Sequence, residues 1–283
     1  MNGHMGVIYQ EHAILGASFS PNEETGVLGV TAYPHEPGPA GTEDGALLFD
    51  LTGSTYVLVS GAGAPQMAQA VLAGRRLQVG QCAHEAVLTG DGVTTSVPLA
   101  LRTGDTEHVL LDPSPRGQVL SAWLGFVAGI EQDGQRPYEG VSVEDASSML
   151  VPFLLVGAAA RSVLLDYVKR PSDLPRPGQV ASVMLDAIGC VVASVPGRPL
   201  NSDAYLVLVP PRAARTLWRS LLSFSEVSPA GLDTLRGVME RDLPWARELD
   251  SSDALRLGRE ALEGWGLVRP GDDFVGARRL GDR

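Results

Sequence analysis

One feature constrains the fold of this chain most: the same order of strand and helix patterns occurs twice. Residues 46–130 and residues 141–224 each carry apolar, strand-like runs that alternate with stretches at helical spacing. The helical stretches 116–129 and 213–224 each place leucine and tryptophan on one face, as amphipathic helices do. Short strands that are joined by turns and separated by such helices favour antiparallel pairing. The sequence therefore predicts an α+β fold made of two α+β units with antiparallel sheets.

We expect four parts along the chain. Residues 1–45 are rich in loops, since residues 33–41 alone hold three prolines and two glycines, and they are expected to pack on the second unit. The proline-rich stretch is either an extended surface loop or a stiff lid over a pocket. Residues 46–140 form the first unit, residues 141–230 the second, and residues 231–283 a helical C-terminal segment.

The composition excludes two classes of binding partner. The chain has 283 residues, 44% of them hydrophobic and 19% charged, with a formal net charge of -11, as expected of a soluble globular protein with a large core. Such an acidic chain repels nucleic acid and anionic membranes, so we expect neither as a partner. It carries no signal-peptide pattern and no apolar stretch of about 18 residues, so a cytoplasmic location is expected.

The cysteines indicate neither a disulfide framework nor a metal centre. Cys82 and Cys190 lie far apart, and no Cys/His spacing of a zinc site occurs. We therefore expect two buried small side chains and no bound metal. The glycines of residues 61–65, which follow a strand pattern, lack the third glycine and the acidic partner of a dinucleotide-binding loop, and they indicate a plain turn from strand to helix.

Residues 84–102 are predicted to form a β-hairpin. Val87 and Leu88 end one apolar strand, and residues 89–92, Thr-Gly-Asp-Gly, have the residue types that a tight turn needs. Beyond the turn, apolar side chains alternate along a return strand that also holds Ser96 and Val97.

Several segments together resemble the glycine-cleavage T-protein family, the folate-dependent aminomethyltransferases. The segments with that resemblance are VIYQEHAILGA at 7–17, GALLFDLTG at 45–53, the stretch 80–92 with its hairpin, GDTEHVLLD at 104–112, NSDAYLVLVP at 201–210, PAGLDTLR at 229–236 and DFVG at 273–276. They occur in the family's order over the whole chain. The resemblance implies a T-protein-like folate-binding fold, in which two α+β units surround a central channel. The family continues into a C-terminal barrel domain, for which we find no counterpart after DFVG.

The resemblance also implies two carboxylates that this chain lacks. The family's general acid/base is an aspartate on the return strand of the hairpin, and the two aspartates there align with Ser96 and Val97. Serine carries no charge near neutral pH and does not replace a carboxylate in kind. The family's pterin-binding glutamate aligns with Leu206, which leaves the pterin donors without an acceptor, at a cost of about 1–3 kcal/mol for each buried group. Tetrahydrofolate is the cofactor that the family implies, and we expect it to bind weakly, if at all; no other cofactor is expected.

The remaining candidate residues follow from the same alignment. His84 aligns with a family tyrosine that faces the channel, and a histidine there suits proton transfer near neutral pH. Asp112 replaces a family asparagine, Trp265 lies near a family Gly-Trp pair, and Arg198 precedes the strand of Leu206 as a contact for an anion. His84 and Ser96 are therefore the catalytic candidates. The ligand-binding candidates are Val97, Asp112, Arg198, Leu206 and Trp265.

The leading functional hypothesis is a divergent aminomethyltransferase-like enzyme that transfers a one-carbon or related group to a small metabolite. A first alternative is a non-folate enzyme of specialised metabolism, which uses the more apolar channel for cyclisation, elimination or hydrolysis. A second is a non-catalytic partner or scaffold protein, since the loss of both carboxylates is typical of a retired active site. The sequence indicates no oligomeric state.

Overall fold

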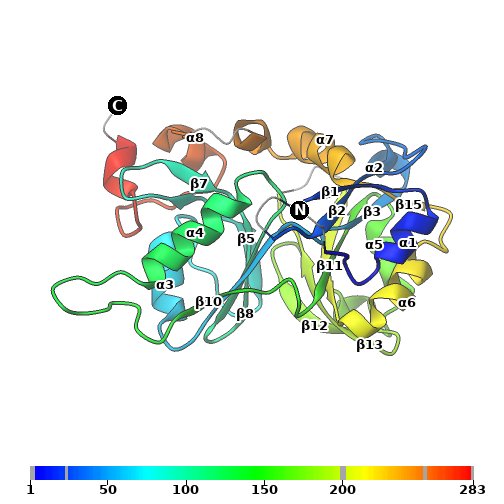
Figure 1. Cartoon of the computed structure of the whole chain (residues 1–283), viewed down its shortest axis with the longest axis horizontal. Helices are drawn as coiled ribbons and strands as arrows, with labels where there is room; N and C mark the ends of the chain where they lie inside the picture. Colours follow the sequence, from blue (N-terminus) through cyan, green and yellow to red (C-terminus); the bar gives the residue numbers. More distant parts are fainter. Residues whose placement is uncertain (1–3, 23–24, 198–201, 251–253, 282–283) are drawn as a thin grey trace. The chain divides into compact units, whose positions relative to one another are not determined.

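The computed structural model describes residues 4–22, 25–197, 202–250 and 254–281. They divide into two compact units, each built of strands and helices (Figure 1). Unit 1 comprises residues 1–54 and 147–243, and unit 2 comprises residues 55–146 and 244–283. The predicted α+β class with mainly antiparallel sheets is confirmed.

Unit 1 is built on a six-stranded sheet with the strand order β12-β13-β14-β11-β3-β15, in which only the edge strand β15 pairs in parallel. Its strands are β1 (Ser18–Pro21), β2 (Leu28–Ala32), β3 (Ala46–Asp50), β11 (Val151–Gly157), β12 (Val180–Leu185), β13 (Ile188–Ser194), β14 (Asp203–Val209) and β15 (Val227–Pro229), of which β1 and β2 form a separate pair. Its helices are α1 (Tyr9–Ile14), α2 (Gly41–Asp44), α5 (Ala160–Leu165), α6 (Pro211–Leu221) and α7 (Leu232–Asp242), with a 3-10 turn η1 (Pro171–Asp173).

The core of unit 1 follows from the alternation of side chains along its strands. Tyr205, Val207 and Val209 of β14 share one face of the sheet and pack with Trp218 of α6. The amphipathic pattern of residues 213–224 thus becomes α6, which buries its apolar face on the sheet. Leu206 alternates with these residues, so it lies on the opposite face of the sheet, where it is also fully buried.

Unit 2 is built on a five-stranded antiparallel sheet with the order β10-β4-β9-β8-β5, together with a separate hairpin of β6 and β7. Its strands are β4 (Thr55–Ser60), β5 (Gln81–His84), β6 (Val87–Leu88), β7 (Thr94–Ser96), β8 (Leu99–Gly104), β9 (Glu107–Asp112) and β10 (Ser142–Asp145). Its helices are α3 (Ala64–Val71), α4 (Gly117–Ala128) and α8 (Arg259–Gly264), with 3-10 turns η2 (Ala246–Asp250) and η3 (Ala277–Gly281).

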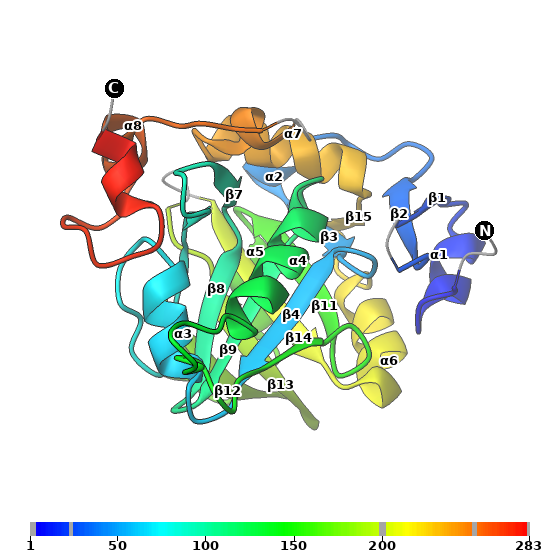
Figure 2. The ribbon, with the colours of Figure 1, turned by 60° about the vertical axis from the view of Figure 1, so that its left-hand side comes forward.

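The helices α3 and α4 cover one face of this sheet (Figure 2). Val57, Ala100 and Leu110 point to that face and pack with both helices. Because neighbouring side chains on a strand point to opposite faces, Leu99 and Leu111 lie on the other face. Side chains on opposite faces of this sheet do not contact each other, so the face on which each candidate residue lies determines its possible neighbours.

The unit boundaries differ from those that we predicted along the chain. Residues 46–50 form β3, which pairs with β11 and so joins the sheet of unit 1. Residues 142–145 form β10, which pairs with β4 at the edge of the sheet of unit 2. The segment 231–283 is divided in the same way, since α7 belongs to unit 1 and residues 244–283 belong to unit 2. Pairing between strands that are distant in sequence therefore decides the units.

The predicted hairpin is present, but its return strand is interrupted. β6 and β7 pair around the turn at residues 89–93, and residues 99–104 continue as β8 in the five-stranded sheet. Pro98 separates the two strands because proline has no N–H for a strand ladder. His84, which we placed at the start of the hairpin, instead ends β5 and pairs with Leu99 of β8. In the part of the chain that the structure describes, no helix is long and apolar enough to span a bilayer.

Candidate functional site

A buried pair of polar side chains, Ser96 and Asp112, connects the hairpin of unit 2 with strand β9. Ser96 ends β7, and its hydroxyl donates a hydrogen bond to Oδ2 of Asp112, which ends β9. Both side chains are almost completely buried. A carboxylate from a different strand, β9, therefore lies beside the hairpin strand.

Asp112 also shapes the turn that leads into α4. Its Oδ1 accepts a hydrogen bond from the backbone N–H of Ser114 at 2.8 Å, as in an Asx turn. Burial raises the pKa of Asp112 and outweighs the hydrogen bonds from Ser96 and Ser114, which lower it. A carboxyl group whose pKa is raised in this way suits proton transfer better than an ordinary aspartate.

Arg116 holds the hairpin strand from the start of α4. Its Nε donates to the carbonyl of Thr95 at 2.7 Å, and one of its terminal nitrogens donates to the carbonyl of Thr94 at 2.9 Å. Its positive charge also lowers the pKa of Asp112, by less than the hydrogen bonds from Ser96 and Ser114 do. Arg116 is buried, and we had not singled it out. The signal was available in the sequence, because an aspartate and an arginine flank the prolines of a strand-to-helix junction.

The tip of the same hairpin is held by the C-terminal part of unit 2. The N–H of Thr94 donates to the carbonyl of Leu255 at 2.7 Å, and Arg256 donates to both the carbonyl and the carboxylate of Asp91. Leu255 and Arg256 therefore support the strand that carries Ser96.

His84 and the Ser96–Asp112 pair lie on different faces of the sheet of unit 2. His84 pairs with Leu99, which pairs with Leu111, so these three side chains share one face. Asp112 follows Leu111 and points to the other face, the one that α3 and α4 cover. A relay between His84 and Ser96, as the two catalytic candidates suggested, does not follow from this arrangement. The reason is the side-chain alternation of β9.

An aromatic neighbour of His84 was missed by the sequence interpretation. The ring of Trp245 lies edge-on to His84, with 5.4 Å between the ring centroids. Trp265, the aromatic residue that aligned near a family Gly-Trp pair, is half-buried and directly follows α8. Nothing in the spacing of the sequence connects Trp245 with His84, because 161 positions separate them.

The other ligand-binding candidates lie in different parts of the chain. Val97 follows Ser96 and is buried. Leu206 belongs to unit 1, where it pairs with Leu154 and Ala193 in a sheet. Arg198 lies outside the described residues. Within the described residues of unit 2, Ser96 contacts Asp112 and Val97 follows Ser96 directly, so these three candidates form one group.

A second buried carboxyl group, Glu85, also escaped the sequence interpretation. It follows β5 directly, and its carboxyl group lies against Gly74. Burial raises its pKa to about 8, although the charge of Arg75 and the N–H groups of Gly74 and Arg75 lower it. A charged residue inside the apolar run CAHEAVL was the available signal.

The buried polar group of unit 1 has a structural role. His12 of α1 contacts the Tyr33 hydroxyl through Nδ1 at 2.6 Å and the Asp50 carboxylate through Nε2 at 2.8 Å. The preceding Glu11 binds Arg219 of α6. These contacts tie α1 to β3 and α6. Among the described residues, no three His, Cys, Asp or Glu side chains are grouped as metal ligands.

Comparison with solved structures identifies the fold. The chain is similar to the glycine cleavage system aminomethyltransferase T from Bartonella henselae, with a TM-score of 0.73 and 19% identity over 98% of this chain and 73% of that one. The chain has the aminomethyltransferase T fold. This confirms the fold that the sequence resemblance implied.

A second solved structure is less similar. It is a chain of the heterotetrameric sarcosine oxidase from Corynebacterium sp. U-96 in complex with pyrrole 2-carboxylate, with a TM-score of 0.40 and 14% identity over 78% of this chain and 100% of that one. No protein-family model and no curated protein matches the sequence.

The described residues do not fit a pterin in the way that the family resemblance implies. A pterin presents N–H donors that need an acceptor. At the position of the expected glutamate stands Leu206, a fully buried apolar residue between two apolar strand neighbours.

Proposed function

We propose that the chain is a divergent aminomethyltransferase-like enzyme that transfers a one-carbon or related group to a small metabolite. The observation that carries this proposal is the buried hydrogen bond between Ser96 of the hairpin and Asp112 of β9. The aminomethyltransferase T fold supports the reaction class, and the carboxyl group of Asp112 supplies the acid/base function that the aligned strand has lost.

The pair is suited to move one proton. When a ligand amine gives its proton to Oγ of Ser96, the hydroxyl proton of Ser96 passes to Oδ2 of Asp112, and the amine nitrogen becomes nucleophilic. One N–H bond is broken, one O–H bond is formed on Asp112, and Ser96 ends with the same number of protons. The raised pKa of Asp112 favours the protonated carboxyl group that this step forms.

Arg116 fixes the position of β7, and with it Ser96, relative to the start of α4. It binds the carbonyls of Thr94 and Thr95, so β7 cannot shift relative to the start of α4 without loss of two hydrogen bonds from a charged donor. Hydrogen bonds of this kind contribute about 1.5–3 kcal/mol each. Arg116 thus acts as a positioning residue for Ser96.

Turnover by substituted proteins tests the proposal. Small metabolites that carry a primary or secondary amine are offered with one-carbon donors, and products are followed by mass spectrometry. We expect Asp112→Asn to lower turnover about 100-fold or more, the range of general acid–base catalysis. Asp105→Asn serves as the control, because Asp105 is exposed at the opposite end of β9. Wild-type turnover in the Asp112→Asn protein would overturn the assignment.

Calorimetry tests the altered cofactor site separately. Two unpaired pterin donors cost about 2–6 kcal/mol, so we expect tetrahydrofolate and 5-methyltetrahydrofolate to bind with dissociation constants well above the micromolar range. Micromolar binding would contradict the argument from Leu206 and restore the ordinary activity of the family.

A non-catalytic role is the second candidate, and a specific observation favours it. Both carboxylate oxygens of Asp112 already accept hydrogen bonds from the chain itself. In a scaffold protein, the pair would only lock the hairpin to α4. In that case no amine substrate is turned over, and Asp112→Asn changes neither ligand binding nor stability.

A further inference from the structure

The helical layer of unit 2, which consists of the two helices α3 and α4 that cover the sheet and does not include α8, carries no charge. Residues 61–74, which include α3, and residues 117–130, which include α4, contain no Asp, Glu, Lys, Arg or His. Since 19% of the whole chain is charged, about five charged residues would be expected in two such runs of 14 residues. Helices on a protein surface ordinarily carry charges on their outer side.

The uncharged helices pack beside each other over the sheet, as Figure 2 shows, and α4 exposes apolar side chains. Phe126 is 62% exposed and Val119 is 43% exposed. The ring of Trp123 stacks on that of Phe126 with a centroid distance of 5.4 Å. The indole nitrogen of Trp123 is buried and has no hydrogen-bond partner among the described residues. Exposed, stacked aromatic rings are typical of the centre of a protein interface.

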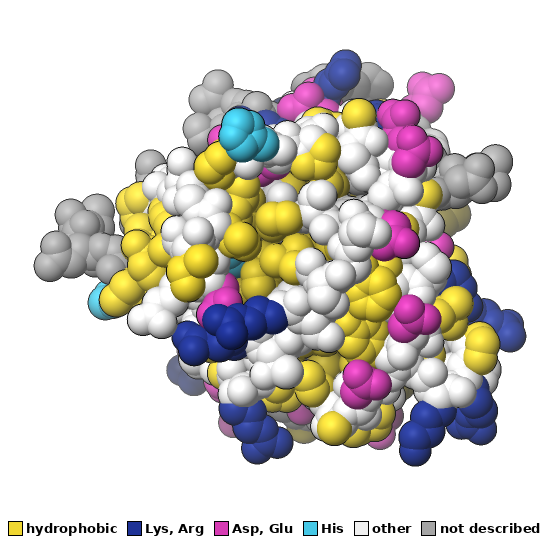
Figure 3. Space-filling model, turned by 90° about the vertical axis from the view of Figure 1, so that its right-hand side faces the viewer, with side chains coloured by type: hydrophobic (Ala, Val, Ile, Leu, Met, Phe, Trp, Pro, Cys, Tyr) yellow, Lys and Arg dark blue, Asp and Glu magenta, His cyan; other side chains and the backbone are white. Residues whose placement is uncertain are grey.

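The corresponding helix of unit 1 shows the contrast. The outer side of α6 carries three exposed arginines, Arg212, Arg215 and Arg219, and Glu11 of α1 pairs with two of them. Figure 3 shows the side of the molecule that carries α1 and α6, where basic and acidic side chains are scattered among hydrophobic ones. The absence of charge is therefore a property of α3 and α4 and not of the helices of this chain in general.

We propose that the outer face of α4 is a homodimer contact, with α4 of a second copy of this chain as its occupant. Two copies with a formal net charge of -11 each repel one another. They approach at least cost where neither presents charge, and the helical layer of unit 2 is such a surface. A charged partner would find no opposite charge to pair with on this face. An identical uncharged face can pack against it without burying an unpaired charge.

The residue sizes along α4 also fit a two-fold contact. The exposed positions run from large to small to large: Val119, then Ala122 and Gly125, then Phe126. In an antiparallel pair of α4 helices related by a two-fold axis, Phe126 of one copy lies against Ala122 and Val119 of the other. The small residues leave room for the ring, so the face is complementary to itself.

Oligomeric state tests the proposal without reference to catalysis. Sedimentation of the full chain over a dilution series is expected to show a monomer–dimer equilibrium. Phe126→Asp should raise the dimer dissociation constant about 30-fold or more, as at an interface hot spot. Because Phe126 is mostly exposed, this change should leave the melting temperature of the monomer nearly unchanged. Ile14→Asp is the matched control, since Ile14 is 77% exposed on α1.

Cross-linking provides the second measurement. Cys82 and Cys190 are both buried, so a cysteine introduced by Ala122→Cys is the reactive thiol under mild oxidation. We expect a disulfide-linked dimer, and none when Phe126→Asp is added. A protein that stays monomeric at every concentration, or a dimer that Phe126→Asp leaves intact, would overturn the proposal. Neither result bears on Ser96 and Asp112, so the proposed function is tested independently.

Discussion

The Ser96 hydroxyl donates a hydrogen bond to the Asp112 carboxylate, which connects the hairpin strand β7 with the end of β9. The same carboxylate accepts the N–H of Ser114 and so forms the turn before α4. One side chain therefore holds two elements in place and supplies the acidic group of the candidate site. Substitutions at Asp112 can separate these two roles.

Asparagine at position 112 should preserve the structure. Its amide oxygen can accept the N–H of Ser114, and its NH₂ group can donate to the Ser96 oxygen, so both hydrogen bonds remain. Alanine leaves the buried Ser96 hydroxyl and the half-buried Ser114 N–H without this acceptor, at a cost of about 1–3 kcal/mol for a fully buried donor and less for a half-buried one. We expect urea denaturation to show a loss of about 2–5 kcal/mol for Asp112→Ala and less than about 1 kcal/mol for Asp112→Asn. Equal losses would show that the charge of Asp112 is what stabilises the fold.

The sequence predicted the individual strands and turns of this site correctly, but it did not predict which strands contact each other. Residues 87–96 were correctly interpreted as a hairpin because a Gly-Asp-Gly turn between apolar runs is a local signal. The contact between Ser96 and Asp112 depends on how β7 lies relative to β9, which no local pattern determines. For the same reason β3 was placed in the wrong unit: its apolar run fits any buried strand, and only its pairing with β11 assigns it.

Glu85 should make the protein less stable as the pH rises. Its pKa is raised from 4.5 to about 8 because burial outweighs the nearby Arg75 and Arg269. Below pH 4.5 the folded and unfolded chains both bind the proton. Between pH 4.5 and 8 the unfolded chain releases it and the folded chain retains it, so the free energy of unfolding falls as the pH increases. The group contributes no further slope above pH 8.

Glu85→Gln removes this dependence, because glutamine is neutral and similar in shape. Denaturation curves at several pH values should show that the free energy of unfolding of the variant, relative to that of the wild type, increases by a few kcal/mol between pH 5 and 8. Glu107→Gln is the control, since Glu107 is exposed on β9 and should leave the profile unchanged. Parallel profiles for the wild type and Glu85→Gln would mean that Glu85 is not a neutral acid in the folded protein.

Gly61 should tolerate no side chain. Its φ of 110° lies in a region that L-residues rarely adopt, and a Cβ atom there would collide with the backbone oxygen of Gly140. We expect Gly61→Ala to lower the free energy of unfolding by about 3 kcal/mol or more. Gly134→Ala is the matched comparison, because Gly134 also has a positive φ but faces open space, so its cost should be about 1–2 kcal/mol. A similar small loss at both positions would contradict the steric argument.

The sequence predicted the turn at Gly61 correctly but did not reveal why a glycine is required there. We predicted a plain turn from strand to helix, because the dinucleotide pattern is incomplete. The structure adds that the glycine is required by a backbone 79 positions further along the chain. Glu85 illustrates the same limit, since its burial against Gly74 depends on tertiary packing and not on residue spacing.

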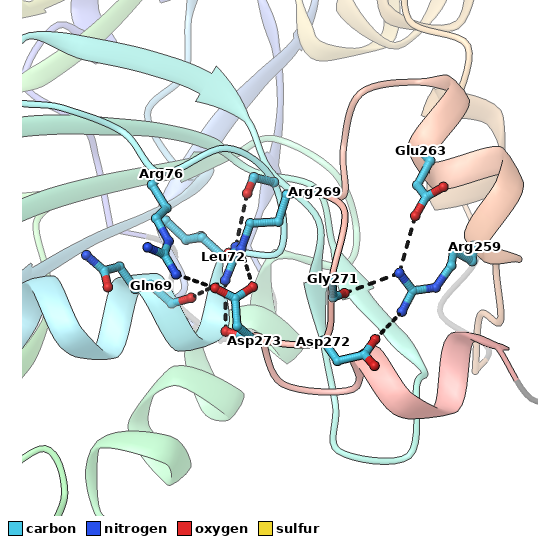
Figure 4. A network of polar contacts seen from close by, with 10 residues as sticks. Gln69, Leu72, Arg76, Arg259, Glu263, Arg269, Gly271, Asp272 and Asp273 are labelled. Carbon is cyan, nitrogen blue, oxygen red and sulfur yellow. Dashed lines mark hydrogen bonds and ion pairs between the residues drawn. The ribbon is translucent and has the colours of Figure 1, made fainter.

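Figure 4 shows the contacts that Arg269 makes with residues at the end of α3 and with Asp273. We predict that these contacts hold the C-terminal part of unit 2 in place. The guanidinium group of Arg269 donates to the carbonyls of Gln69 and Leu72 at the end of α3, at 2.7 and 2.6 Å, and to the carbonyl of Gly74. These carbonyls have no partner within the helix, and a planar fork of donors can satisfy several at once. Its Nε also binds the Asp273 carboxylate at 2.8 Å.

Arg269→Lys keeps the charge and loses the fork, so we expect faster amide exchange across residues 255–281. The effect should extend to Thr94 on the hairpin, because its N–H is held by Leu255. Arg76→Ala provides the control, since Arg76 pairs with the same Asp273 but is 57% exposed, and exposed ion pairs contribute about 0–1 kcal/mol. Unchanged exchange in Arg269→Lys, or an equal effect in Arg76→Ala, would show that charge alone holds this segment, and the hairpin would then not depend on the carbonyl contacts of α3.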